Sequence, residues 1–175
     1  GYTEPAQALV HDQEFDRAPG SSAPEFQRTP GYPAFVAAIY WITGDDAPGG
    51  TGDAVIVGVQ AALSGLSVLL AMLVALRLSG SSVVMLAVGL MVGLDPLQTS
   101  QAGLIVSETL ATVFTTLAVY CGVRFLQAGA DRLPVRWAAA CGLSLVAATY
   151  VRPTTYYFPA LVVLALSGAA LWQRR

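Results

Sequence analysis

One carboxylate, Glu108, stands alone among uncharged residues between Asp95 and Arg124. On insertion scales a carboxylate at the centre of a membrane helix costs about 2.5–3.5 kcal/mol, so such a residue is expected to face a polar cavity or a partner. We expect Glu108 to lie about one to two turns inside a span over residues 102–126, near its external end. It is then a candidate catalytic acid, or a group that reaches the interface or pairs with an arginine such as Arg152.

Two arginines stand beside prolines and aromatic residues, in a setting that suits an anionic ligand. Arg28 precedes the turn Pro30-Gly31-Tyr32-Pro33, and Arg152 precedes Pro153. Because the planar guanidinium group matches the geometry of a phosphate, Arg28, Tyr32 and Arg152 are candidate substrate-binding residues. Arginine beside aromatic residues is also typical of an anchor at the headgroup level of a membrane. Both interpretations stay open at this stage.

Gln60 is the one strongly polar residue in the apolar run 54–78 before Arg77, which closes the run. It is a candidate for contact with a substrate groove, although a hydrogen bond between helices is the more common role of such a residue. The only histidine, His11, lies in an acidic N-terminal segment that we interpret as a solvated loop, so no metal site is predicted. Cys121 and Cys141 lie in apolar runs and are expected to pack as small hydrophobic residues.

The composition of the 175-residue chain is that of a membrane protein. Hydrophobic residues make up 55% and charged residues only 11%, with a mean hydropathy of +0.60, whereas soluble domains average about 25% charged residues. The net charge is −2 and all nine basic residues are arginine. This balance, without a basic patch, excludes a nucleic-acid partner. The sequence also lacks a zinc spacing, a phosphate-binding P-loop and a serine-nucleophile elbow.

The elements that must position these residues are helices. The pattern predicts an all-α polytopic membrane protein with an external loop over residues 1–52 and a transmembrane helical bundle over residues 53–175. The loop carries a short apolar helix at 33–43, which is too short to cross a hydrocarbon core of about 30 Å and is therefore interfacial. The apolar runs predict about five transmembrane helices, at 54–78, 82–94, 102–126, 135–150 and 155–172.

The positions of the arginines support five spans, with successive loops on alternate sides of the membrane. With five spans, six of the nine arginines fall on one side of the membrane: Arg77, Arg124, Arg132, Arg136, Arg174 and Arg175. The positive-inside rule makes that side, with the C-terminus, cytoplasmic. Residues 1–52, Glu108 and Arg152 then lie on or near the external face.

Four segments, in order along the chain, resemble one enzyme family. Residues 28–37 resemble the R-x-P-G-Y-P-x-F-L-A segment of bacterial family 39-like glycosyltransferases of the GT-C class, and residues 59–64 resemble its V-Q-x-L-L-S segment. Residues 105–110 are similar to I-x-S-E-T-L, and residues 150–153 to L-x-R-P. Members of this class are related to dolichyl-phosphate-mannose protein mannosyltransferases and to the lipid A aminoarabinose transferase.

The resemblance implies a multi-pass enzyme of the plasma (inner) membrane. It would transfer a sugar from a polyprenyl-phosphate donor to a protein, lipid or glycan acceptor on the external face, with a possible divalent cation. Glu108 would be the second acidic position of the site, while Arg28 and Arg152 would contact the carrier phosphate. The family's main base, an aspartate, is expected just before Gly1. We therefore expect the chain to be a fragment that is inactive in isolation.

Two other classes of function fit the same residues. A non-enzymatic polytopic protein, such as a transporter or an assembly subunit, would show inverted repeats or broken helices near the middle of the membrane. The sequence shows no such pair of segments. A polymerase or flippase for lipid-linked glycans could use the same external cations.

Overall fold

The computed structural model describes residues 1–25, 28–128 and 135–173. The regular elements in these ranges are all helices, and none is a strand. The chain is therefore all-α, as the sequence predicts. The elements in order are α1 (Thr3–His11), α2 (Gly31–Thr43), α3 (Thr51–Ser79), α4 (Ser82–Gly93), α5 (Pro96–Ala102), α6 (Glu108–Gln127), α7 (Val135–Val151), the short 3₁₀ helix η1 (Pro153–Thr155) and α8 (Phe158–Gln173).

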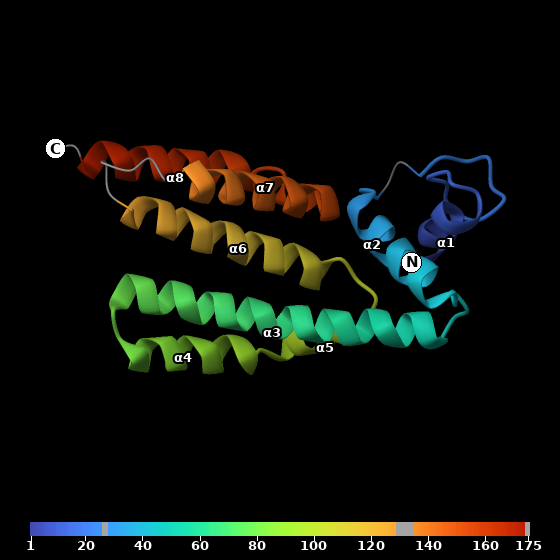
Figure 1. Cartoon of the computed structure of the whole chain (residues 1–175), viewed down its shortest axis with the longest axis horizontal. Coiled ribbons are helices and arrows are strands. Elements are labelled where there is room, and N and C mark those ends of the chain that lie inside the picture. The colour runs from blue at the N-terminus through green and yellow to red at the C-terminus, as the bar shows by residue number, and fades with distance from the viewer. Residues whose placement is uncertain (26–27, 129–134, 174–175) are drawn as a thin grey trace.

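The long helices lie side by side, and α1 and α2 cover one end of them (Figure 1). α4 runs back along α3, α6 packs on α3, and α7 packs on α6, with the most extensive contact between α6 and α7. The beginning of α3, the beginning of α6 and the end of α7 all lie at the end covered by α1 and α2 (Figure 1). Residues that are far apart in the sequence, around 32, 56, 108 and 151, therefore meet there.

The surface of the helical bundle is apolar, as expected of a membrane protein. Leu90, Met91 and Leu143 expose 63%, 76% and 71% of their surface, and α4 has no buried residue. In the described residues α3 and α6 are long and apolar enough to cross a bilayer, and α4 with α5, bent by 57°, form a third candidate span. The 17-residue α7 is a shorter apolar helix. The total of five spans stays a prediction.

Local sequence signals set several helix ends. Gly80 ends α3 with a φ of 68°, a left-handed conformation that costs glycine little. Pro96 starts α5, whose N-terminus is capped by the Asp95 carboxylate accepting from the Leu97 amide at 3.0 Å. The last predicted span, about 155–172, has its helix start three residues later. Its helix, α8, begins at Phe158, because Pro153 starts the separate 3₁₀ turn first.

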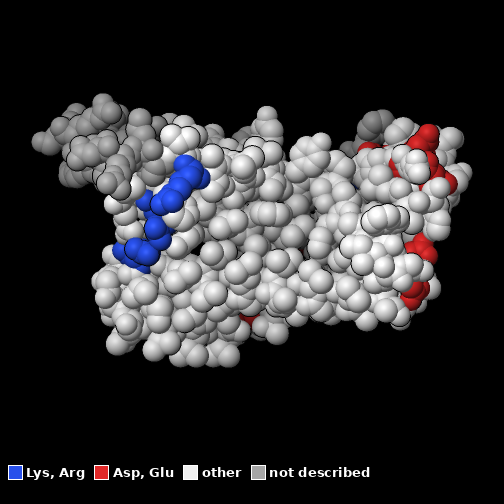
Figure 2. Space-filling view, in the orientation of Figure 1, with Lys and Arg blue, Asp and Glu red and all other residues white. Residues whose placement is uncertain are grey.

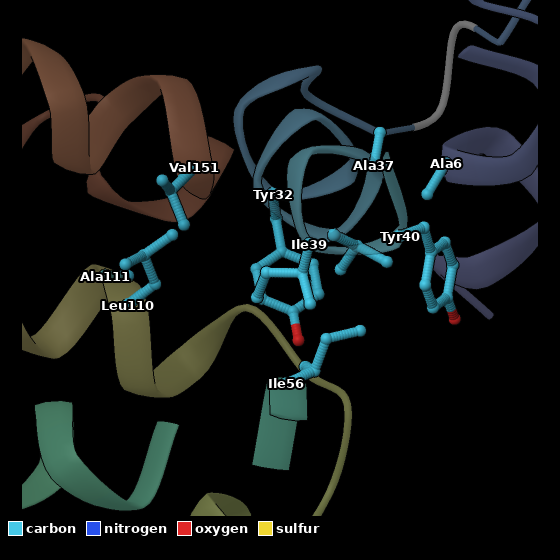
Figure 3. Close-up of a cluster of buried hydrophobic side chains, with 10 residues drawn as sticks. Ala6, Tyr32, Ala37, Ile39, Tyr40, Ile56, Leu110, Ala111 and Val151 are labelled. Atoms are coloured by element: carbon cyan, nitrogen blue, oxygen red, sulfur yellow. The ribbon is translucent and has the colours of Figure 1, made fainter. Parts of the chain in front are cut away.

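The end that α1 and α2 cover has its own hydrophobic core, drawn in Figure 3. Tyr32 of α2 is fully buried at its centre, with Ile56 of α3, Leu110 of α6 and Val151 of α7 around it (Figure 3). The helix predicted at 33–43 is present and starts two residues earlier, at Gly31, while its interfacial position stays a prediction. This core fixes the N-terminal segment to the helices that carry Glu108 and Arg152.

The loop between α2 and α3 is tied to α1 and to itself. His11 Nε2 lies 2.8 Å from Asp46 Oδ2, and the Gln7 side chain donates to the Asp46 carbonyl at 2.8 Å. The Asp45 carboxylate accepts from the amides of Ala47 and Thr51 at 3.1 and 2.6 Å. These hydrogen bonds hold the pKa of Asp45 below its usual value, and the bond from the Ala47 amide has the largest effect.

Candidate functional site

Glu108 is the first residue of α6, which corrects the prediction that it lies inside a span beginning at residue 102. α5 ends at Ala102, and residues 103–107 form a non-helical link between the two helices. The carboxylate therefore lies at a helix N-terminus, where the macrodipole stabilises a negative charge by about 0.3–1 kcal/mol. The cost of burying it in the middle of the membrane does not arise.

Glu108 and Arg152 form an ion pair across α6 and the end of α7. Arg152 Nη1 lies 3.3 Å from Glu108 Oε1, and the side chains are 37% and 26% exposed, respectively. Arg152 has left the helix, with a φ of −144° and a ψ of 119°. Because Pro153 follows, an extended backbone at Arg152 is the expected conformation. The sequence raised this pairing as one alternative for Glu108, and the structure confirms it.

The ion pair lines a cavity of about 230 Å³ between α6, η1 and the start of α8. Three threonines of α6 complete one wall: Thr112, Thr115 and Thr116. Their hydroxyls each donate to the backbone carbonyl four residues earlier, at 2.8 Å, so each still has lone pairs that can accept. The cavity thus combines one cation, one anion and several hydroxyl oxygens, a set that suits a phosphate or a sugar.

Tyr32 and Gln60 lie in the core beside this cavity and are absent from its lining. Gln60 is fully buried and its Nε2 donates to the Val106 carbonyl at 2.9 Å, so it holds the link before α6. Burial raises the pKa of Tyr32, with smaller contributions from Tyr2 and Glu108. Within the described residues neither the Tyr32 hydroxyl nor Gln60 Oε1 makes a hydrogen bond of good geometry, although the Gln60 side chain is close enough to lower the pKa of Tyr32 by a smaller, opposing contribution. Their predicted contact with substrate stays a prediction, whereas their packing role is observed.

Arg28 does not line the cavity of Glu108 and Arg152. Its Nη1 lies 2.6 Å from Glu25 Oε2, and its guanidinium carbon lies 5.8 Å from the centre of the Tyr2 ring. Tyr2 in turn forms a hydrogen bond of 3.1 Å between its hydroxyl and Ser107 Oγ, next to Glu108. Arg28 is thus connected to the site through one aromatic residue, and its contact with a carrier phosphate stays a prediction.

Residue-by-residue reasoning overlooked Tyr2, Ser107 and Thr29. The ring of Tyr2 packs edge-on against Tyr32, with 4.8 Å between centroids, and Ser107 is buried before Glu108. The Thr29 hydroxyl donates to the Val151 carbonyl at 2.9 Å, so the Pro-Gly-Tyr-Pro turn rests on the end of α7. A lone serine, threonine or tyrosine carries no signal in the sequence, because each is common at helix ends and turns.

The side chains in the described part of this site form a poor set of ligands for a divalent cation. Glu108 is the one carboxylate in the cavity lining, and it is paired with Arg152. Within residues 1–25, 28–128 and 135–173 no cluster of three or more His, Cys, Asp or Glu side chains could hold a metal ion. The residues described here therefore assign no step to a metal.

The comparison with known families covers most of the chain. The family model described as dolichyl-phosphate-mannose-protein mannosyltransferase matches residues 37–175, a range that contains Gln60, Glu108 and Arg152 but neither Arg28 nor Tyr32. Neither the curated proteins nor the solved structures include a significant match. The helical bundle, its apolar surface and the family match agree with one another. The chain belongs to the dolichyl-phosphate-mannose-protein mannosyltransferase family, which makes it a membrane glycosyltransferase of the GT-C type.

Proposed function

We propose that the protein transfers a sugar from a polyprenyl-phosphate-linked donor to an acceptor hydroxyl on the external face of the membrane. The observation that carries this proposal is the Glu108–Arg152 ion pair, which lines a cavity at the end of the bundle covered by α1 and α2. The family name favours a mannosyl-type sugar and a protein acceptor. A plasma (inner) membrane location is part of the same proposal.

Arg152 is the group we assign to the carrier phosphate. One of its nitrogens faces Glu108, and the planar guanidinium has further donors that can bind phosphate oxygens. As the bond from the sugar to the phosphate breaks, negative charge develops on the phosphate, and a fixed cation stabilises it. The N-terminus of α6 adds a partial positive charge at the same place.

Glu108 has two roles in this proposal. It holds Arg152 in position before the donor arrives, and it accepts a hydrogen bond from the acceptor hydroxyl or from a sugar hydroxyl. The proton of the acceptor goes to a general base as the anomeric carbon is attacked. Its ion pair with Arg152 suits Glu108 to orientation of that cation and of a hydroxyl group more than to proton transfer.

The charges of the two ends support the external assignment. Arg77, Arg124 and Arg136 belong to the last turn of α3, the last turn of α6 and the first turn of α7, at the far end from α1. Acidic side chains gather at the opposite end, over α1 and the loop after α2 (Figure 2). By the positive-inside rule the arginine end faces the cytoplasm, so the cavity of Glu108 faces outward.

The test is Glu108→Gln in the full-length enzyme, assayed in proteoliposomes with a polyprenyl-phosphate mannose donor and a peptide acceptor. We expect transfer to fall by about 10²-fold or more, because Arg152 loses its ion-pair partner and the substrate hydroxyl loses the carboxylate that orients it. Arg152→Gln should raise KM for the lipid donor as well as lower kcat, and Arg152→Lys should restore part of both.

The matched control is Glu14→Gln, which removes an exposed carboxylate from the loop after α1. It should leave transfer unchanged. Wild-type turnover in Glu108→Gln would remove the residue from the site. Transport of polyprenyl phosphate by the wild type without any sugar transfer would instead favour a transporter or flippase.

A further inference from the structure

Three arginines at the end far from α1 have no carboxylate partner in the part of the chain that the structure describes. They are Arg77, Arg124 and Arg136, and none of the ion pairs found there includes them. Arg77 and Arg136 are exposed, and Arg124 is half-buried. Arginine side chains form a continuous stripe across this end of the molecule (Figure 2). A bound anion would neutralise the positive charge of such a stripe.

Two of these guanidinium groups are held in place by one indole ring. The guanidinium carbons of Arg124 and Arg136 lie 4.6 and 5.4 Å from the centre of the Trp137 ring. Arg124 also donates to the Tyr120 hydroxyl at 3.3 Å. An arginine that stacks on an aromatic face keeps its in-plane N–H groups available for a phosphate. Both side chains are therefore oriented before any ligand binds.

The third arginine is brought to the same end by a contact between α3 and α6. The Gln127 side chain donates to the Arg77 carbonyl at 2.7 Å, so the last turns of the two helices are joined. Gln127 follows Arg124 by three residues, which is about one helical turn. α3, α6 and α7 thus each contribute one cation to this end.

An apolar groove of about 570 Å³ lies between α3, α4 and α6 and reaches the last turn of α3, although none of the three arginines is part of its lining. Leu78 and Ser79, the two residues after Arg77, are part of its lining. The groove continues along the bundle between aliphatic residues, among them Ala71, Val74, Ala75, Val84, Val88 and Val119. A row of arginines near one end of an apolar groove has the polarity of a phospholipid in the adjacent leaflet.

We propose that this end binds one anionic phospholipid, with its phosphate on Arg77, Arg124 and Arg136 and an acyl chain in the groove. Charge complementarity and the position of the stripe at the end of membrane-crossing helices select a lipid over a soluble anion. The proposed phosphate site, at the ends of α3 and α6, lies at the opposite end of the bundle from the Glu108–Arg152 ion pair, and its groove shares Thr115 and Thr116 with the cavity of that pair. It is a second lipid site, for a structural lipid.

The experiment uses the full-length protein purified in a neutral detergent, with phosphatidylglycerol or phosphatidylcholine added, and native mass spectrometry to count retained lipids. The wild type should retain one phosphatidylglycerol in preference to phosphatidylcholine. Arg77→Gln and Arg136→Gln should each weaken its binding about five-fold, the contribution of one arginine near an anionic surface. Ala75→Phe, which fills the groove, should weaken it as well.

The matched control is Arg17→Gln, which removes one exposed arginine from the other end and should leave lipid retention unchanged. Inorganic phosphate alone should not displace the lipid, because it has no acyl chain. Equal retention by wild type and the Arg77→Gln/Arg136→Gln double variant overturns the proposal. So does a groove that takes polyprenyl phosphate or a second protein copy in place of phosphatidylglycerol.

Discussion

At the scale of single residues, Gly31 decides how closely α2 can approach α7. A Cβ atom built on Gly31 would lie 2.5 Å from the carbonyl oxygen and 2.7 Å from the carbonyl carbon of Tyr150. These are backbone atoms at the end of a helix and cannot move independently. The Thr29 hydroxyl bonds to the next carbonyl, that of Val151. The glycine therefore seats the turn against the residues that lead into Arg152.

We predict that Gly31→Ala destabilises the protein by about 1–3 kcal/mol, the usual cost of forcing an extra carbon into a packed position. The thermal unfolding midpoint of the purified full-length protein measures this. Gly58→Ala is the control, because a Cβ there meets nothing within 4 Å on the exposed face of α3. That change should be neutral or stabilising by about 0.5–1 kcal/mol. Equal midpoints for the two variants would contradict the close approach.

At the scale of elements, the link between α5 and α6 is held by two distant side chains. Gln60 of α3 donates to the Val106 carbonyl, and Tyr2, just before α1, bonds to Ser107. Both contacts precede Glu108 by one or two residues, so they set where α6 begins. The N-terminal segment is thus part of the support of the site and not a separate appendage.

The Tyr2–Ser107 bond can be measured by a double-mutant cycle of Tyr2→Phe and Ser107→Ala. We expect a coupling free energy of unfolding of about 0.5–1.5 kcal/mol, the net value of a hydrogen bond. Tyr156→Phe serves as the control, because this residue is 69% exposed and should not couple to Ser107→Ala. If the two single substitutions are additive in the unfolding midpoint, the hydroxyl does not hold the link.

At the scale of the whole molecule, the two ends differ in charge (Figure 2). Arginines cluster where α3 and α6 end, and acidic residues cluster over α1 and the loop after α2. A bilayer around the apolar middle of the bundle would place the ends in different water layers. By the positive-inside rule, this charge difference predicts that the arginine-rich end faces the cytoplasm.

We predict that cysteines introduced at the two ends are labelled from opposite sides. Ser22→Cys, in the loop after α1, should react with a membrane-impermeant maleimide in intact cells, and Ser82→Cys, at the start of α4, only in inverted vesicles. The background carries Cys121→Ala and Cys141→Ala, although both native thiols are buried. Labelling of both sites from one side would rule out the assigned orientation.

Much of the helical framework could be predicted from apolar runs. The predicted stretches 54–78 and 135–150 coincide closely with the helices α3 and α7, because uninterrupted apolar sequence of sufficient length favours a helix regardless of its neighbours. That α7 crosses a membrane stays a prediction. The buried state of Cys121 and Cys141 follows from the same runs and is confirmed. The family resemblance, read from four short segments, is confirmed by the match over residues 37–175.

The sequence by itself determined the class of the protein: an all-α membrane chain with Glu108 and Arg152 as its notable charges. Only the tertiary structure decided that α6 begins at Glu108, because residues 103–107 are apolar enough to continue a helix. They are held apart from it by Gln60 and Tyr2, which are 46 and 105 positions from their partners. It also decided that Arg28 pairs with Glu25 while Arg152 pairs with Glu108. Local propensity cannot encode such contacts, since they exist only once the helices have packed.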